Sequence, residues 1–185
     1  MKTLISKSLV ILFIFLILLG GMMLKKNNDI FAFDKNITKK ELLFEIISDK
    51  KIYQISKPIK LKLIFKNNLS KDIIFNKRLG IDEYNTPHEL REVIFDIIKP
   101  SGKRASLQVD ILRDKIKEEE FIILKNKAKY IKDIILSDYY IDEFSEIGLY
   151  TISATYENTT KSHGTSVEAW IGKIKSNIIA VVIKK

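Results

Sequence analysis

Residues 148–156 constrain the fold more than any other stretch of the chain. Within them, large or apolar side chains recur at intervals of two, at Tyr150, Ile152, Ala154 and Tyr156. Residues two apart in a β-strand share one face, and the residues between these four are mostly polar. The pattern therefore predicts a half-buried strand with a glycine at its entrance.

The residues that lead into this strand have the spacing of a tyrosine corner. Glu146, Gly148 and Tyr150 follow one another at intervals of two. In such a corner the phenol hydroxyl hydrogen-bonds to the backbone a few residues upstream, and the motif is typical of Greek-key β-sandwiches. We therefore predict this bond for Tyr150 and a β-sandwich for the chain.

Other apolar runs recur at the spacing expected of a sandwich. They predict strands at 42–48, 59–67, 72–75, 92–98, 105–111, 121–124, 130–136 and 178–183. The last run is apolar on both faces, so we expect it to be central and buried, or to form an edge against another chain. One helical turn is predicted at 137–141, capped by Ser137, with Leu136 and Ile141 as a hydrophobic staple.

The N-terminus has the composition of a secretory signal. Lys2 and Lys7 precede an unbroken apolar run at 9–19, which is the arrangement of a signal peptide. No clean small-x-small cleavage site follows, so residues 1–24 are interpreted as a signal peptide or a membrane anchor. An uncleaved segment at 9–24 is short against the roughly 20 residues that span a bilayer, but local thinning makes it tolerable.

The remaining chain is long enough for one domain. Residues 25–40 are polar and rich in lysine and asparagine, which indicates a linker. Residues 41–185 are predicted to form a single β-sandwich, and 185 residues in total suit one domain with a targeting segment. We expect this domain outside the cytoplasm, either secreted or anchored to the cell membrane by its N-terminal helix.

Lysine dominates the charge of the chain. The formal net charge is +9, and the few arginines are Arg78, Arg91, Arg104 and Arg113. Arginine is the usual reader of base edges, so nucleic acid is not an expected partner. Two interpretations of the lysines stay open: solvated strand faces, or a surface that attracts anionic polymers or anionic membrane.

Few residues carry recognisable chemistry. The chain has no cysteine, which excludes disulfides, thiol catalysis and thiolate metal sites. Its two histidines, His88 and His163, lie in loop-like stretches and are interpreted as solvated, or else as meeting at one end of the sandwich. The acidic groups lack calcium-loop spacing; they are Glu118 to Glu120, and Asp138, Asp142, Glu143 and Glu146. We predict no catalytic, cofactor-binding or metal-binding residues.

Two irregular stretches, 77–89 and 157–167, are the places where we look first for binding. Both lack a hydrophobic period, and loops carry function more often than strands do. Plain sandwich-end loops fit the same pattern. Trp170, the single tryptophan, is expected to pack in the core, with a ligand-facing platform as the alternative.

Much of the chain resembles a pattern that is widespread in bacterial extracytoplasmic Ig-like domains. The resemblance covers residues 121–156 and 168–183, with its motifs at Leu136 to Tyr140, Gly148 to Tyr156 and Trp170 to Asn177. It implies an Ig-like Greek-key fold, used in such proteins for binding, adhesion or scaffolding, and in some relatives for proteinase inhibition. No residue here matches a diagnostic inhibitory loop.

The sequence thus predicts an all-β, Ig-like Greek-key β-sandwich preceded by an N-terminal hydrophobic helix. We expect a non-enzymatic, exported binding or interaction module at the cell envelope, without a cofactor. Its expected partner is a protein or an anionic envelope polymer, with membrane contact through residues 9–24. The alternative is a proteinase inhibitor that presents loop 77–89 or 157–167.

Overall fold

The computed structural model describes residues 41–83, 86, 91–108, 117–158 and 169–185. The chain divides into two compact units, Met1–Thr38 and Lys39–Lys185, and every described residue belongs to the second. The predicted N-terminal hydrophobic helix lies outside the described residues.

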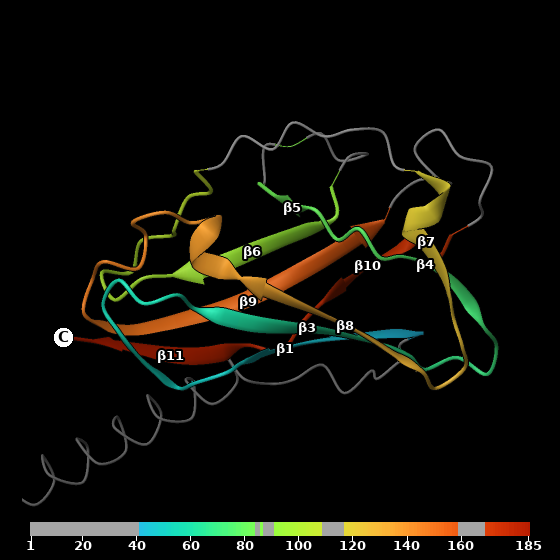
Figure 1. The fold of residues 1–185 in the computed structure, drawn as a ribbon, viewed down its shortest axis with the longest axis horizontal. Helices are drawn as coiled ribbons and strands as arrows, with labels where there is room; N and C mark the ends of the chain where they lie inside the picture. The colour runs from blue at the N-terminus through green and yellow to red at the C-terminus, as the bar shows by residue number, and fades with distance from the viewer. Residues whose placement is uncertain (1–40, 84–85, 87–90, 109–116, 159–168) are drawn as a thin grey trace, which may run out of the picture. The chain divides into compact units, whose positions relative to one another are not determined.

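The described residues are mostly β-strand with almost no helix, so the predicted all-β class is confirmed. In chain order the strands are β1 (Leu42–Ser48), β2 (Ile52–Gln54), β3 (Lys60–Asn67), β4 (Ile73–Asn76), β5 (Ile81–Asp82), β6 (Val93–Ile98), β7 (Phe121–Leu124), β8 (Lys129–Ile135), β9 (Gly148–Asn158), β10 (Gly172–Lys175) and β11 (Ile179–Lys184) (Figure 1). Two short 3-10 helices accompany them, η3 (Glu118–Glu120) and η4 (Leu136–Asp138). In this part of the chain no helix is long and apolar enough to cross a membrane.

The strands form two larger sheets and one short pair. One sheet has the order β1-β3-β8, and the other has the order β2-β11-β9-β6-β5, with β10 also paired to β9. Strands β4 and β7 form the short pair. Strand β4 comes directly after β3 in the chain, and β7 comes directly before β8. Most pairs are antiparallel, but β2 runs parallel to β11 and β5 parallel to β6.

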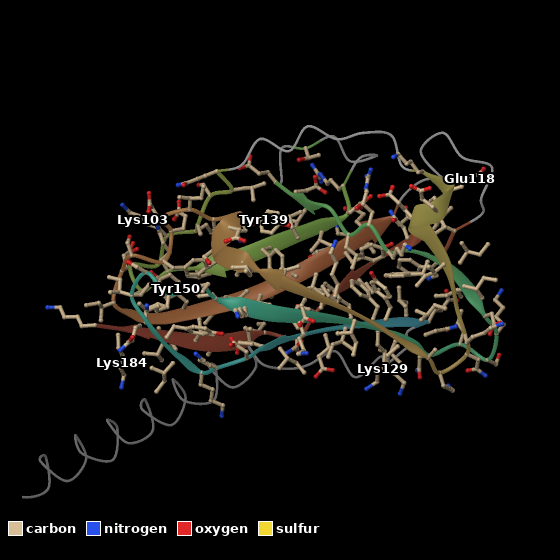
Figure 2. All side chains as sticks on the ribbon, in the orientation of Figure 1. Lys103, Glu118, Lys129, Tyr139, Tyr150 and Lys184 are labelled. Atoms are coloured by element: carbon tan, nitrogen blue, oxygen red, sulfur yellow. The ribbon has the colours of Figure 1, made fainter. Side chains whose placement is uncertain are left out.

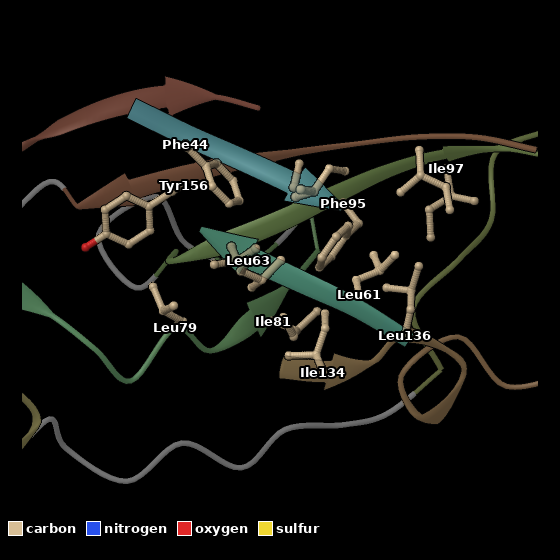
Figure 3. Packing of buried hydrophobic residues seen from close by; sticks show 14 of the residues in the cluster. Phe44, Leu61, Leu63, Leu79, Ile81, Phe95, Ile97, Ile134, Leu136 and Tyr156 are labelled. Carbon is tan, nitrogen blue, oxygen red and sulfur yellow. The ribbon is translucent and has the colours of Figure 1, made fainter. Parts of the chain in front are cut away.

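The core lies between the inner faces of the two larger sheets. The four inward residues predicted for β9 are all buried. Phe65 of β3 meets Tyr156 of β9 edge to face at 5.1 Å between ring centroids, and Phe44 of β1 stacks on Phe65 at 4.3 Å. Figure 3 shows Phe44 and Leu63 from one sheet packed opposite Phe95 and Tyr156 from the other.

The predicted tyrosine corner is present. The Tyr150 hydroxyl donates to the Glu146 carbonyl at 2.9 Å and accepts from the Glu146 N–H at 3.1 Å. The glycine of the motif is required by close packing, because a Cβ on Gly148 would lie 2.9 Å from the Pro100 ring. The corner therefore fixes where β9 begins and how the 98–104 turn packs against it.

Three details of the sequence-based prediction are corrected. The 3-10 turn starts at Leu136, so Ser137 lies inside it and no side-chain cap bond forms. The staple is wrong, because Ile141 is exposed while Leu136 is buried. Strand β11 is central, as predicted, but its outer face is not buried: Ala180 on that face is exposed.

Candidate functional site

The first half of the predicted loop 77–89 is held by a buried carboxylate. Glu92, only 1% exposed, accepts hydrogen bonds from Asn76 Nδ2 at 3.0 Å and from Arg78 Nε at 2.9 Å and Nη2 at 2.6 Å. Its other oxygen accepts from the Gly80 N–H. The donors come from the last residue of β4 and from the segment just after it, so one side chain fixes the path of that segment.

Further charged groups surround this carboxylate. The Glu92 N–H donates to Asp82 Oδ2 at 2.7 Å, and the Lys132 ammonium donates to the Arg78 carbonyl. Burial lowers the pKa of Lys132, and the charge of Glu92 opposes that shift. The Tyr156 hydroxyl is buried without a hydrogen-bond partner among the described residues, and burial raises its pKa. These contacts stabilise the loop base, and we assign them a structural role.

The predictions for the two histidines are untested. His88 and His163 lie outside the described residues, as do 84–85, 87–90 and 159–168. Trp170 packs against the core as predicted: it is half-buried and stacks on Tyr156 at 5.9 Å between ring centroids. Its indole nitrogen is buried and has no hydrogen-bond partner in the part of the chain that the structure describes.

The predicted acidic groups are spread over the surface. Glu118 to Glu120 form the 3-10 turn η3, while Glu143 and Glu146 both pair with Lys99, at 2.7 and 3.6 Å. Hydrogen bonds to the hydroxyl and N–H of Ser101, together with Lys99, lower the pKa of Glu146. Among the described residues, no three histidine, aspartate or glutamate side chains gather as a metal site would require.

A groove of about 360 Å³ lies between the β2–β3 connection and the segment after η4. Ser56 and Asp142 line it, and both have left-handed backbone, with φ of 63° and 59°. Pro58 and Phe144 supply apolar lining, and Ser137 supplies a hydroxyl. The hydroxyl of Ser137 is engaged by the Ile59 N–H at 3.4 Å.

Three apolar side chains, two exposed and one half-buried, lie side by side on the outer face of the six-stranded sheet. Val182 of β11 pairs with Ile52 of β2 on one side and with Leu149 of β9 on the other. The next residue in each strand is buried in the core, so alternation places these three side chains on the outer face. Ile52 is 52% exposed and Leu149 is 54% exposed. We call Ile52, Val182 and Leu149 the apolar row.

Exposed lysines flank the apolar row. Lys51 precedes Ile52, and its carbonyl accepts from the Val182 N–H at 2.9 Å. Lys184 pairs with Gln54 two residues further along β11, and its carbonyl accepts from the Ile55 N–H at 2.7 Å. Both lysine side chains are exposed. The row therefore combines apolar contact area with positive charge at its margin.

A second lysine-rich surface lies at the two bends that separate β3 from β4 and β7 from β8. We call it the lysine end, and it comprises Lys66, Lys71, Lys125, Lys127 and Lys129. The buried amide of Asn67 joins the two bends, since its Nδ2 donates to the Lys71 carbonyl at 2.8 Å and to the Leu124 carbonyl at 2.9 Å. Asn126 N–H also donates to Asp72 Oδ1 at 2.9 Å.

Neither surface was identified as a site from the sequence. The apolar row depends on β2, whose three residues are too few to show a period. The lysines of the lysine end come from two bends that are more than fifty residues apart in the chain. The only signal in the sequence was the general excess of lysine.

Comparisons with known proteins add little to these observations. No protein-family model matches the chain, and no curated protein matches it. The structure of Pseudomonas fluorescens alkylpurine DNA glycosylase AlkC, bound to DNA containing an abasic site analogue, matches 78% of this chain at a TM-score of 0.35 and 8% identity. The match covers 31% of that protein. A likeness of this strength identifies neither a fold nor a function.

Proposed function

We propose that the chain is a non-enzymatic, exported binding module at the cell envelope. In this proposal an Ig-like Greek-key β-sandwich is held at the membrane by the hydrophobic segment 9–24. The apolar row docks a partner protein. The partner carries apolar side chains bordered by acidic residues, complementary to the row and its lysines.

Two observations support the Ig-like assignment. The tyrosine corner at Tyr150 is a hallmark of such sandwiches. In addition, the N-terminal part of the domain contributes to both sheets, because β1 pairs with β3 while β2 pairs in parallel with the last strand, β11. Consecutive strands that belong to different sheets connect the two layers through the backbone.

The apolar row is the observation that carries the binding function. Single exposed apolar residues are ordinary, but contiguous ones rimmed by polar residues mark interaction surfaces. Here three apolar side chains lie on adjacent strands in direct register, at a spacing of roughly 4.8 Å. Lysines at the rim favour an acidic partner surface, which raises the association rate and the selectivity for that partner.

Site-specific crosslinking tests this proposal, because the chain has no cysteine of its own. Ile52→Cys and Ile131→Cys make a matched pair: both replace isoleucine, and the side chains are 52% and 50% exposed. Ile131 lies on β8, in the other sheet. The full-length variants, carrying a thiol-linked photo-crosslinker in membranes of producing cells, should give a discrete protein adduct from position 52 and none from position 131.

A second substitution makes the result specific. Leu149→Asp should abolish the position-52 adduct, and the purified adduct partner should bind the parent chain at least tenfold more tightly than it binds this variant. Because Leu149 is exposed, its replacement should leave the unfolding midpoint nearly unchanged. The proposal fails if both positions give the same adducts or if Leu149→Asp has no effect. An adduct of twice the chain mass would instead identify a second copy of this chain.

The proteinase-inhibitor alternative stays a prediction. Five of the thirteen residues of loop 77–89 and nine of the eleven residues of loop 157–167, the two loops that would carry it, fall outside the described residues. No contact within the described part favours it over the docking of a partner on the apolar row.

A further inference from the structure

We infer that the lysine end is a docking surface for the anionic lipid headgroups of the membrane, and that this docking turns the apolar row away from the bilayer. The inference rests on the proposed tether at residues 9–24. It deepens the proposed function, since it says which end of the module faces the membrane and which end faces partners.

The lysines of this end are mostly uncompensated. Lys125 pairs with Asp72 at 2.9 Å, and Lys127 donates to the Asn68 carbonyl at 3.1 Å. Lys66, Lys71 and Lys129 form no ion pair with any described residue. The surface therefore holds positive charge that an anionic layer would neutralise.

The backbone beneath these lysines is already ordered. Besides the Asn67 amide bonds, the Lys127 N–H donates to the Asn67 carbonyl and the Asn67 N–H to the Ala128 carbonyl, both at 3.1 Å. Lys127 itself has left-handed backbone, with φ of 62°, in a turn closed by the Ala128 N–H and the Lys125 carbonyl at 3.0 Å. A pre-organised surface loses little conformational entropy when it binds.

The chain enters the folded unit at the lysine end. The Glu41 carbonyl accepts a hydrogen bond from the Asn68 N–H at 2.9 Å, so the first described residue is fixed beside the bend. The linker 25–40 joins this point to the hydrophobic segment 9–24. These sixteen residues span at most roughly 55 Å even when fully extended, so a retained anchor limits how far this end can lie from the headgroups.

The two surfaces lie at opposite ends of the strands. Lys66 and Lys129 pair with each other at one end of β3 and β8, whereas β2, which carries Ile52, follows the end of β1 where Ser48 pairs with Leu61. From Leu61 to Lys66 a strand extends roughly 17 Å. Figure 2 shows Lys184 near the left end of the domain and Lys129 well to the right of it. Docking by the lysine end therefore presents the apolar row to partners.

Anionic lipid is favoured over a free anionic polymer by the position of the chain entry. A tether that emerges beside the lysines makes membrane docking an intramolecular step, with an effective concentration that a free polymer lacks. Attraction to an anionic leaflet acts within a Debye length of roughly 8–10 Å at physiological salt, which the short linker permits.

The test uses the full chain reconstituted in vesicles of phosphatidylcholine alone or with 30% phosphatidylglycerol. A fluorescent donor is placed on Asn126→Cys, between the lysines, or on Lys103→Cys at the opposite end, and the acceptor is on the lipid headgroups. Energy transfer from position 126 should rise at least twofold with phosphatidylglycerol and fall back in 0.5 M salt. Transfer from position 103 should not rise.

Charge reversal supplies the matched control. Lys71→Glu with Lys129→Glu should remove the phosphatidylglycerol effect, whereas Lys57→Glu with Lys184→Glu, an equal change of net charge at the other end, should preserve it. The inference is overturned if both pairs act alike, if positions 103 and 126 respond alike, or if soluble poly(glycerol phosphate) binds the lysine end while phosphatidylglycerol has no effect. Chain that does not float with either vesicle would refute the tether itself, which distinguishes a failure of the proposed function from a failure of lipid docking.

Discussion

Replacing Glu92 by glutamine tests the role of a buried carboxylate that accepts four hydrogen bonds. The substitution keeps the size of the side chain and removes its charge. In the structure one oxygen serves Asn76 and Arg78, and the other serves the Gly80 N–H. An amide offers one acceptor oxygen and one donor group, so its –NH₂ must face a donor on one of the two sides.

The expected cost follows from burial. Removing one member of a buried ion pair typically costs about 3–5 kcal/mol, because the other charge stays desolvated. Glu92 is almost fully buried, whereas the Arg78 side chain is 20% exposed and keeps some water. We therefore expect a loss near the lower end of that range, about 3 kcal/mol. For a domain of this size that corresponds to a fall in Tm of roughly 6–12 °C.

Urea unfolding of the full chain in mild detergent measures this, with the fluorescence of the single tryptophan, Trp170, as the signal. Glu45→Gln is the control: that glutamate is exposed on β1, and its change should stay within about 0.5 kcal/mol. Adding Arg78→Met should reduce the cost of Glu92→Gln by at least 1 kcal/mol, since the stranded charge is gone. A cost below 1 kcal/mol, or strict additivity in the double variant, would refute the reasoning.

Three further predictions follow from backbone strain, close packing and burial. Lys127→Gly should raise the free energy of unfolding by up to about 1 kcal/mol, because glycine adopts the left-handed conformation without strain; a loss of stability in urea unfolding would contradict this. Gly172→Ala should lower it by about 1–3 kcal/mol and shift the Trp170 emission, since the new Cβ would lie 2.5 Å from that ring; unchanged emission would show that the ring is not in contact. Burial, and then the hydrogen bond to Asp49 at 2.5 Å, raise the pKa of Tyr53 to about 12. The unfolded chain therefore loses this proton first, so the contribution of Tyr53 is complete below pH 10 and is lost as the pH rises through about 12; Tyr53→Phe should flatten the decline in stability measured over that range.

Most strands with a clear two-residue period were predictable from the sequence, but the strand predicted at 105–111 does not form over its described residues, 105–108. The inward and outward sets of β3 and β9 were assigned correctly, and the bounds of β7 were exact. In these segments the burial of one face dominates the free energy of folding. The alternation of apolar and polar residues in the sequence therefore shows which face is buried. The tyrosine corner was equally predictable, because Glu146, Gly148 and Tyr150 are close together in the chain.

Pairings between distant segments were not predictable in this way. Strand β5 has two residues, and it gains its place from parallel pairing with β6. Strand β10 alternates lysine with small or apolar residues, and its position comes from pairing with the far end of β9. Asn67 was expected only as the last residue of the strand at 59–67. Its role as a buried amide that joins two bends depends on Leu124, which is far away in sequence.

The apolar row follows from how the domain protects its last strand. Strand β11 has apolar side chains on both faces, and alone it would be an exposed edge prone to pair with other chains. Strand β2 covers that edge through backbone bonds from Val182 to Lys51 and from Ile55 to Lys184. Edge protection needs only this backbone pairing and tolerates polar side chains outside. Exposed Ile52 and Leu149 beside Val182 therefore contribute little to folding, which is why we propose that a partner covers their apolar surface.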